Sequence, residues 1–267
     1  MREIGIPPKA GLLTLTPLKG SWFYFMPVAP GPLYIVATPI GNLEDITYRA
    51  VSILKRVDYI AAEDTRRTKK LLTAYGLSGR LVPYHDHNKQ RQAGRIVADL
   101  IDGQSVALVS DAGTPGISDP GYLLINEAIR NNIAVIPIPG PSAIIAALSV
   151  SGLPTDRFAF EGYLPRKPSR RRACIEEFKQ EMRTLIIYES PYRIAATLHD
   201  ILDICGNRYV VIAREITKIH EEITRDWLSS VLQSWAPGKV KGEFTIILAS
   251  EHHSIRLARE PHRASLV

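Results

Sequence analysis

Short apolar segments alternate with longer helix-like segments throughout residues 33–138, and this alternation constrains the fold more than any other feature. Apolar runs predict strands at 33–37, 58–62, 81–84, 105–109 and 133–138. The segments between them predict helices at 48–57, 65–75, 88–102 and 122–131. Strands that alternate with helices in this way form parallel sheets with right-handed crossovers, so we expect such a sheet here.

The tripeptide Pro139-Gly140-Pro141 interrupts the pattern, which then starts again. Further strands are predicted at 157–163, 185–188, 209–213 and 244–249. Further helices are predicted at 142–150, 169–182, 192–205 and 226–235. The sequence therefore predicts an α/β protein made of two α/β domains, at residues 33–139 and 140–250.

The two ends of the chain lack these patterns. Residues 1–32 are rich in proline, and we expect an irregular N-terminal extension. Their apolar run at 22–26 is too short for the centre of a signal peptide, which needs roughly 7–15 residues. Residues 251–267 are expected to form a basic tail without regular structure.

Composition excludes several classes of protein. No apolar run approaches the roughly 20 residues that a membrane-spanning helix needs, so we expect no membrane partner. Cys174 and Cys205 are the two cysteines of the chain, and their separation excludes a zinc ribbon or a disulfide scaffold. A reducing cytoplasm is the predicted location.

Glycine- and proline-rich loops follow three of the predicted strands, at 38–45, 110–121 and 139–143. Neither of the first two matches the glycine patterns of dinucleotide or phosphate-loop sites. In open α/β sheets, ligands bind beyond the carboxyl ends of the strands. Each loop alone is explained by turn formation, but the three together are expected to surround one ligand.

Six segments carry a family resemblance, namely TPIGNLEDIT, AEDTRRTKKLL, SDAGTPGISDPG, PGPSA, YESPYRI and REITKIHEE. In this order they resemble the ribosomal RNA-methylating branch of the tetrapyrrole methylase family, over about residues 33–249. The resemblance implies two α/β domains with S-adenosylmethionine in the cleft between them. It also implies a homodimer that methylates the 2′-oxygen of a cytidine in the decoding region of small-subunit (16S) ribosomal RNA.

The resemblance also assigns contacts with the methyl donor to individual positions. The implied contacts are Ile40, Gly41, Ser110, Asp111, Ala112, Gly113, Ser142, Ala143, Glu189 and Ile216. Glycines at two of these positions let the backbone approach a ligand closely. Ser142 has an alternative interpretation, because a serine at the start of a helix is also a typical N-cap.

A ribose hydroxyl needs either a base or precise alignment to attack a methyl donor. Asp64 is the first candidate base, because a carboxylate at this position resembles the proton acceptor of tetrapyrrole-methylating relatives. Glu63 is the reserve base, and Lys218 is a candidate for lowering the pKa of the hydroxyl. The alternative for Asp64 is an N-cap of the helix that follows it.

Basic residues cluster on the predicted helix at 65–75 and again around 166–172. Phosphate contacts are predicted for Arg66, Arg67, Arg166, Lys167, Arg170, Arg171 and Arg172. The alternative interpretation of each cluster is a solvated surface. His85 and His87 lack a third neighbouring ligand, and so does the His252-His253 pair. We therefore predict no metal site.

Two alternatives to RNA methylation remain open at this point. The first is methylation of carbon on a tetrapyrrole ring, as in the small-molecule branch of the same family. The second is a ribosome-assembly factor that keeps the fold without turnover. An assay of methyl transfer to RNA distinguishes an RNA methyltransferase from both alternatives, because neither would methylate RNA.

Overall fold

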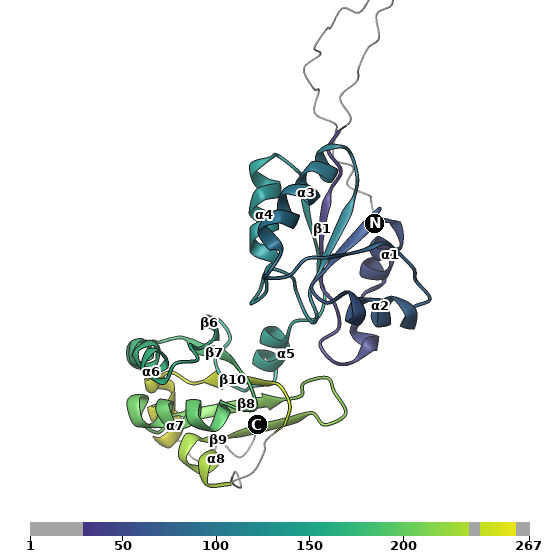
Figure 1. The fold of residues 1–267 in the computed structure, drawn as a ribbon. Coiled ribbons are helices and arrows are strands. Elements are labelled where there is room, and N and C mark those ends of the chain that lie inside the picture. Colours follow the sequence, from purple (N-terminus) through teal and green to yellow (C-terminus); the bar gives the residue numbers. More distant parts are fainter. Residues whose placement is uncertain (1–28, 235–240, 260–267) are drawn as a thin grey trace, which may run out of the picture.

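The computed structural model describes residues 29–234 and 241–259, so the predicted N-terminal extension lies almost wholly outside the described residues. The described strands form two five-stranded sheets, which Figure 1 shows in separate halves of the molecule. We call these the N-terminal half and the C-terminal half. The boundary predicted at residue 139 falls in the link between the last strand of the first sheet and the helix that follows.

The first sheet is parallel throughout and has the strand order β3-β2-β4-β1-β5. Its strands are β1 (Leu33–Val36), β2 (Tyr59–Ala62), β3 (Leu81–Pro83), β4 (Val106–Val109) and β5 (Val135–Ile138). All lie where the apolar runs predict them, so the predicted parallel sheet is confirmed. Parallel strands place their carboxyl ends at one edge, which brings the loops after β1, β4 and β5 together.

Helices cover both faces of this sheet. They are α1 (Tyr48–Arg56), α2 (Thr65–Ala74), α3 (Lys89–Ile101) and α4 (Gly121–Arg130), with a short 3₁₀ helix η1 (Leu43–Asp45) before α1. Apolar side chains of α1 and α2 pack on one face, and those of α3 and α4 pack on the other. Because both faces are covered, β2 and β4 are buried along their whole length, as their unbroken apolar sequence indicates.

The second sheet is mixed and has the order β6-β7-β10-β8-β9. Its strands are β6 (Phe158–Tyr163), β7 (Thr184–Glu189), β8 (Tyr209–Arg214), β9 (Glu222–Trp227) and β10 (Phe244–Leu248). Strands β6 and β7 are parallel, and the other neighbours are antiparallel. The C-terminal half therefore does not repeat the parallel topology of the N-terminal half.

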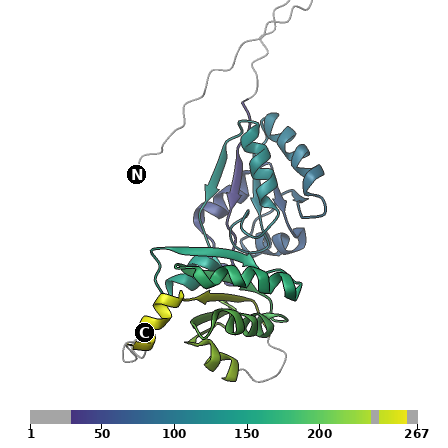
Figure 2. The ribbon, with the colours of Figure 1, turned by 90° about the vertical axis from the view of Figure 1, so that its left-hand side faces the viewer.

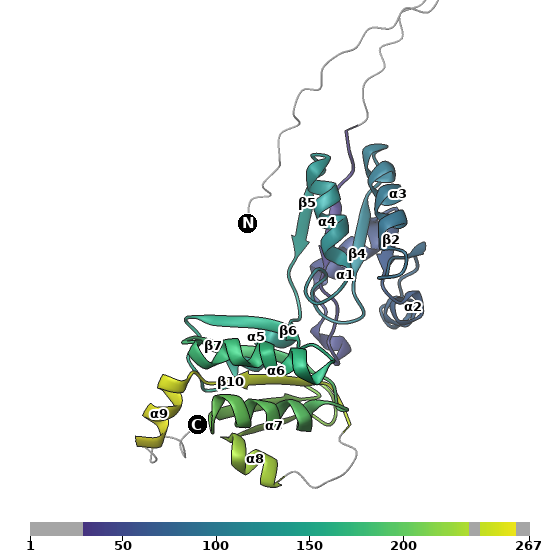
Figure 3. The ribbon, with the colours of Figure 1, turned by 60° about the vertical axis from the view of Figure 1, so that its left-hand side comes forward.

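The helices of the C-terminal half also divide between the two faces of its sheet. They are α5 (Ala143–Ser149), α6 (Pro168–Glu177), α7 (Ile194–Cys205), α8 (Leu228–Ser234) and α9 (Glu251–Arg259), with the 3₁₀ helix η2 (Phe178–Gln180) after α6. Helices α6, α7 and α8 pack on one face and α5 on the other. Figure 3 shows α6 and α7 side by side along the sheet. No helix of the described ranges is long and apolar enough to span a membrane.

Two predictions at the end of the chain are wrong. The helix predicted at 226–235 begins two residues later, because β9 pairs with β8 and ends at Trp227. As an edge strand, β9 is only partly buried and carries several polar side chains, so its apolar alternation is weak. The tail predicted to be irregular instead begins with α9, which Figure 2 shows at the outer end of the C-terminal half. Ser250 accepts a hydrogen bond from the His253 backbone N–H at the start of this helix.

A buried ion pair joins α6 to α7. The Arg171 guanidinium contacts the Asp200 carboxylate at 2.6 Å, and both side chains are almost completely buried. The second carboxylate oxygen of Asp200 accepts a hydrogen bond from Arg172, which also reaches Asp203. A buried charge whose partner is removed is strongly destabilising, because desolvation is then uncompensated.

Asp200→Ala should therefore lower the free energy of unfolding by about 3–5 kcal/mol. Asp203→Ala is the matched control, because its side chain is 60% exposed and it pairs with the same Arg172. An exposed pair contributes about 0–1 kcal/mol, so the control should change little. Urea unfolding of both variants measures the difference, and equal losses would contradict a structural role for the Arg171–Asp200 pair.

Candidate active site

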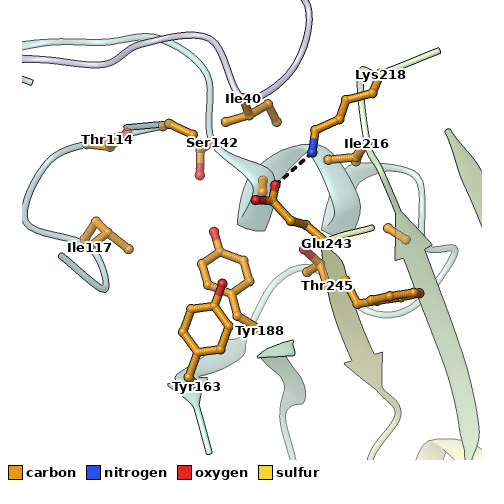
Figure 4. Close-up of a pocket in the computed structure, with 15 residues that line it drawn as sticks. Ile40, Thr114, Ile117, Ser142, Tyr163, Tyr188, Ile216, Lys218, Glu243 and Thr245 are labelled. Atoms are coloured by element: carbon orange, nitrogen blue, oxygen red, sulfur yellow. Dashed lines mark hydrogen bonds and ion pairs between the residues drawn. The ribbon is translucent and has the colours of Figure 1, made fainter. Parts of the chain in front are cut away.

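A cavity lies between the two halves of the molecule, and we call it the central cavity. Figure 4 shows side chains from both halves around it. Its empty volume is about 760 Å³, part of which is open to solvent. Its lining residues are Ile40, Ala112, Gly113, Thr114, Ile117, Ser142, Ala143, Tyr163, Tyr188, Ala213, Ile216, Lys218, Glu243, Phe244 and Thr245.

The N-terminal wall of this cavity is built from the loops after β1 and β4. Thr38 and Gly113 exchange two backbone hydrogen bonds, of 2.9 and 3.0 Å, which tie the loops together. The Thr38 hydroxyl also donates to the Ser110 carbonyl. Gly113 has a φ of +83°, a conformation that side chains with a Cβ rarely adopt, so this bridge needs glycine. The link into α5 adds Ser142, whose hydroxyl makes no capping hydrogen bond.

Two tyrosines form much of the opposite wall. The ring centroids of Tyr163, on β6, and Tyr188, on β7, lie 5.6 Å apart. Burial raises the pKa of Tyr188 to about 12 and also raises the pKa of Tyr163. Both phenols therefore stay protonated at neutral pH and are hydrogen-bond donors. Neither tyrosine is among the donor contacts predicted from the sequence, because an aromatic residue in a predicted strand is more simply explained as core.

Lys218 and Glu243 meet at the rim of the cavity, where Figure 4 marks their ion pair. The Lys218 ammonium also contacts Glu215 at 2.8 Å. Burial alone would lower the pKa of Lys218, but hydrogen bonds to Glu215 and Glu243 outweigh it, and the pKa is above its usual value. Lys218 is thus charged, and two carboxylates balance that charge.

The loop that carries Lys218 also touches the N-terminal half. A Cβ on Gly41 would lie 2.4 Å from Cγ of Lys218 and 2.8 Å from the Thr217 hydroxyl. That hydroxyl accepts a hydrogen bond from the Asn42 backbone N–H. Glu215 and Thr217 both have positive φ values, so the loop is held in a strained conformation where the halves meet.

A second cavity adjoins the central one, and we call it the α2 cavity. It shares Ile40, Ala112, Lys218 and Glu243 with the central cavity. Its other lining residues include Gly41, Ser110 and Asp111, together with the α2 residues Arg67, Thr68, Lys70 and Leu71. The lining carries charges of both signs, because Arg67 lies 3.4 Å from Asp111 and Lys218 pairs with Glu243.

The structure thus distributes the predicted donor contacts over two cavities. Ile40, Ala112, Gly113, Ser142, Ala143 and Ile216 line the central cavity, and Gly41, Ser110 and Asp111 line the α2 cavity. Glu189 lines neither. Its carboxylate is fully buried and binds Arg193, the Thr197 hydroxyl and the Ser190 backbone N–H. The Glu189 side chain therefore holds its own loop in place, and a donor contact at this position stays a prediction.

The two predicted bases lie outside the lining of both cavities. Asp64 is the N-cap of α2 and accepts a hydrogen bond from the Arg66 backbone N–H at 2.8 Å. Side-chain and backbone hydrogen bonds from Arg66 lower the pKa of Asp64 to about 2. Such a carboxylate is a weak base. Glu63 accepts a hydrogen bond from the Asp111 backbone N–H, and burial raises its pKa.

The predicted phosphate contacts fall into two groups. Arg166, Lys167 and Arg170 are exposed. Arg66 and Arg67 are exposed too, but Arg66 pairs with Asp64 and Arg67 lies 3.4 Å from Asp111. Arg171 is buried in its ion pair with Asp200, so the prediction that it contacts RNA is wrong. Arg172 is bound to Asp200 and Asp203 on α7, which restricts it as well. Among the described residues, no cluster of three or more potential ligands could hold a metal ion.

The sequence is similar to a protein family and to several known proteins. Residues 32–232 match the profile of the tetrapyrrole (corrin/porphyrin) methylases. The ribosomal RNA small subunit methyltransferase I of Halalkalibacterium halodurans is 54% identical over 82% of this chain and 75% of its own. The protein of the same name from Escherichia coli O157:H7 is 50% identical over 82% of this chain and 77% of its own.

Solved structures share the fold at lower identity. Uroporphyrin-III C-methyltransferase from Thermus thermophilus, in complex with S-adenyl homocysteine, has a TM-score of 0.56 and 17% identity. That match covers 85% of this chain and all of that one. Diphthine synthase has a TM-score of 0.61 and 16% identity, and its match covers 86% of this chain and 95% of that one. One fold therefore occurs in enzymes with different names.

Proposed function

The chain belongs to the tetrapyrrole methylase family, and we propose that it transfers a methyl group from S-adenosylmethionine to RNA of the small ribosomal subunit. The central cavity, built by both halves, is the observation that carries the proposal. Relatives near 50% identity that are named as small-subunit ribosomal RNA methyltransferases support the substrate class. The proposed acceptor is the 2′-oxygen of a cytidine in the decoding region, and the proposed location is the cytoplasm.

The residues of the central cavity fit the methyl donor. Its adenosine and amino-acid parts need apolar contact together with hydrogen-bond partners, and the cavity offers Ile40, Ile216 and the Ser142 hydroxyl. The protonated phenols of Tyr163 and Tyr188 add two donors. When bound, S-adenosylmethionine supplies an electrophilic methyl group on a positively charged sulfur. The protein would contribute position, by holding the acceptor oxygen in line with that methyl group.

Ala143→Leu should fill the cavity and weaken binding of S-adenosylmethionine by at least about tenfold, or 1.4 kcal/mol. Ala143 opens α5 and lines the cavity, and leucine keeps its helical propensity. Ser149→Leu, at the exposed end of the same helix, is the matched control and should bind normally. Calorimetry measures the donor affinity of both variants, after melting temperatures equal to wild type have shown that they are folded. Normal donor binding by Ala143→Leu would mean that the donor binds elsewhere.

Methyl transfer leaves one proton of the ribose hydroxyl to be removed. We propose Glu243 for this step in place of Asp64, because Glu243 lines both cavities and Asp64 lines neither. One carboxylate oxygen of Glu243 contacts Lys218 at 2.9 Å, so the lysine orients the carboxylate. Lys218 thereby acts as a positioning residue, and Glu63, beside Asp111, remains the reserve.

Glu243→Gln should slow single-turnover methylation by roughly 10²-fold or more, whereas Asp64→Asn should stay within about threefold of wild type. Asparagine keeps the capping interaction of Asp64 and loses only its proton affinity. Rates are compared at saturating donor, so that any change in donor affinity is separated from the chemical step. A large loss in Asp64→Asn with a normal rate in Glu243→Gln would restore Asp64 as the base.

The function is tested by incubation of the protein with labelled donor and unmodified small ribosomal subunits. We expect one labelled nucleotide, a cytidine of the decoding region methylated on its 2′-oxygen. Nuclease mapping and mass spectrometry of the labelled RNA identify the position and the atom. Label on a tetrapyrrole and none on the subunit would contradict the proposal and favour the small-molecule branch of the family. Normal subunit binding without transfer would indicate an assembly factor.

The active unit is proposed to be a homodimer, as the family resemblance implies. Light scattering at micromolar concentration should give twice the 29.7 kDa mass of one chain. A mass of one chain would contradict this part of the proposal alone.

A further inference from the structure

A third cavity opens next to the central one, and we call it the Tyr192 cavity. Ser118 and Asp86 of the N-terminal half line one side of it, and residues of the loops after β6 and β7 line the other. Tyr163 lines both this cavity and the central one, and the α2 cavity does not include it. The Tyr192 cavity and the α2 cavity therefore adjoin the central cavity through different residues.

The aromatic ring of Tyr192 stands in solvent on a rigid turn. The residue is 93% exposed, although its neighbours on the turn are well anchored. The Arg193 and Ile194 backbone N–H groups both donate to the Ser190 carbonyl. The Arg193 guanidinium binds the buried Glu189 and also donates to the Leu164 carbonyl at 2.9 Å. The buried Glu189–Arg193 ion pair thus anchors a turn whose outermost side chain, Tyr192, is exposed.

The loop after β6 adds a positive charge to the same cavity. Arg166 is exposed, and within residues 29–234 and 241–259 it forms no hydrogen bond or ion pair. Arg193, in contrast, is fully engaged by Glu189 and Leu164. An exposed arginine beside an exposed aromatic ring is the combination that binds single-stranded nucleic acid, by phosphate contact and base stacking.

Backbone geometry fixes Tyr163 between the two cavities. The pairing of β6 with β7 shifts between Phe160 and Tyr163, and Gly162 in this bulge has a φ of +65°. Bulges next to active sites change the direction of a side chain. Across the gap, Ser118 also has a positive φ, and a Cβ on Gly162 would lie 3.2 Å from its hydroxyl. The two halves therefore approach closely beside Tyr163.

We propose that the Tyr192 cavity binds one unpaired nucleotide of the substrate RNA. Its base stacks on Tyr192, its phosphate contacts Arg166, and its ribose lies toward Tyr163 and the central cavity. This inference rests on the proposed function, because it assigns a site to the same RNA.

The test compares Tyr192→Ala and Tyr192→Phe with wild type in equilibrium binding of unmodified small ribosomal subunits. Stacking predicts a loss of affinity of about 5- to 100-fold for alanine and almost none for phenylalanine, which keeps the ring. Tyr48→Ala is the matched control, because Tyr48 is 97% exposed on α1 and lines none of the three cavities. Calorimetry should show unchanged donor affinity in every variant.

A second variant tests the phosphate contact. Arg166→Ala should weaken subunit binding and reduce the slope of log affinity against log salt by about 1, as expected for one lost phosphate contact. Unchanged affinity in Tyr192→Ala, or an equal loss in Tyr192→Phe, would overturn the stacking site. An unchanged salt slope in Arg166→Ala would overturn the phosphate contact.

These outcomes are distinct from failure of the proposed function. If wild type methylates the subunit and Tyr192→Ala binds it normally, the function stands and the site is wrong. If wild type binds the subunit without methyl transfer, the function is wrong and the Tyr192 variants still decide the site. If wild type neither binds nor methylates the subunit, both proposals are overturned.

Discussion

Two backbone hydrogen bonds between Thr38 and Gly113 are the interaction on which the site depends. They join the loops after β1 and β4, which neighbour each other in the parallel sheet. Because both partners are backbone groups, the bridge leaves the side chains of Ile40 and Ala112 available to line the cavities. The positive φ of Gly113 is required for this geometry. The N-terminal wall is thus set by strand order and one glycine.

The C-terminal half completes the site with a different kind of structure. Its mixed sheet places Tyr163 and Tyr188 on neighbouring parallel strands, while Glu243 lies immediately before the antiparallel strand β10. The strained loop at Glu215 and Thr217 brings Lys218 against Gly41 and toward Glu243. Neither half alone encloses the central cavity, so the relative placement of the halves is part of the active site.

The sequence predicts the parallel sheet well because β2 and β4 are buried on both faces and therefore apolar along their length. It predicts that the loops after β1 and β4 lie together, because glycine and proline mark the carboxyl ends of these strands. It misses β9, since an edge strand carries polar side chains and depends on β8 for its hydrogen bonds. It misplaces Arg171, whose buried partner Asp200 lies on another helix and leaves no local signal in the sequence.

For the site, too, residues in local sequence motifs are predictable, and residues that only tertiary structure brings to the site are not. Ile40 and Gly113 belong to recognisable loops, whereas Glu243 has no motif of its own and joins the site only when β10 pairs with β7 and β8. The exposure of Tyr192 is equally invisible in the sequence, because YESPYRI contains two tyrosines and only Tyr188 packs against other rings. Tertiary structure therefore decides which aromatic residue is available to a ligand.

The central claim is that one cavity, walled by both halves, binds the methyl donor. A crystal structure of the protein with S-adenosylhomocysteine tests it most directly. The account predicts a ligand that contacts the loop at Gly113 and Ala143 on one side and Ile216 and Thr245 on the other. A ligand bound to one half alone, outside these residues, would contradict the account.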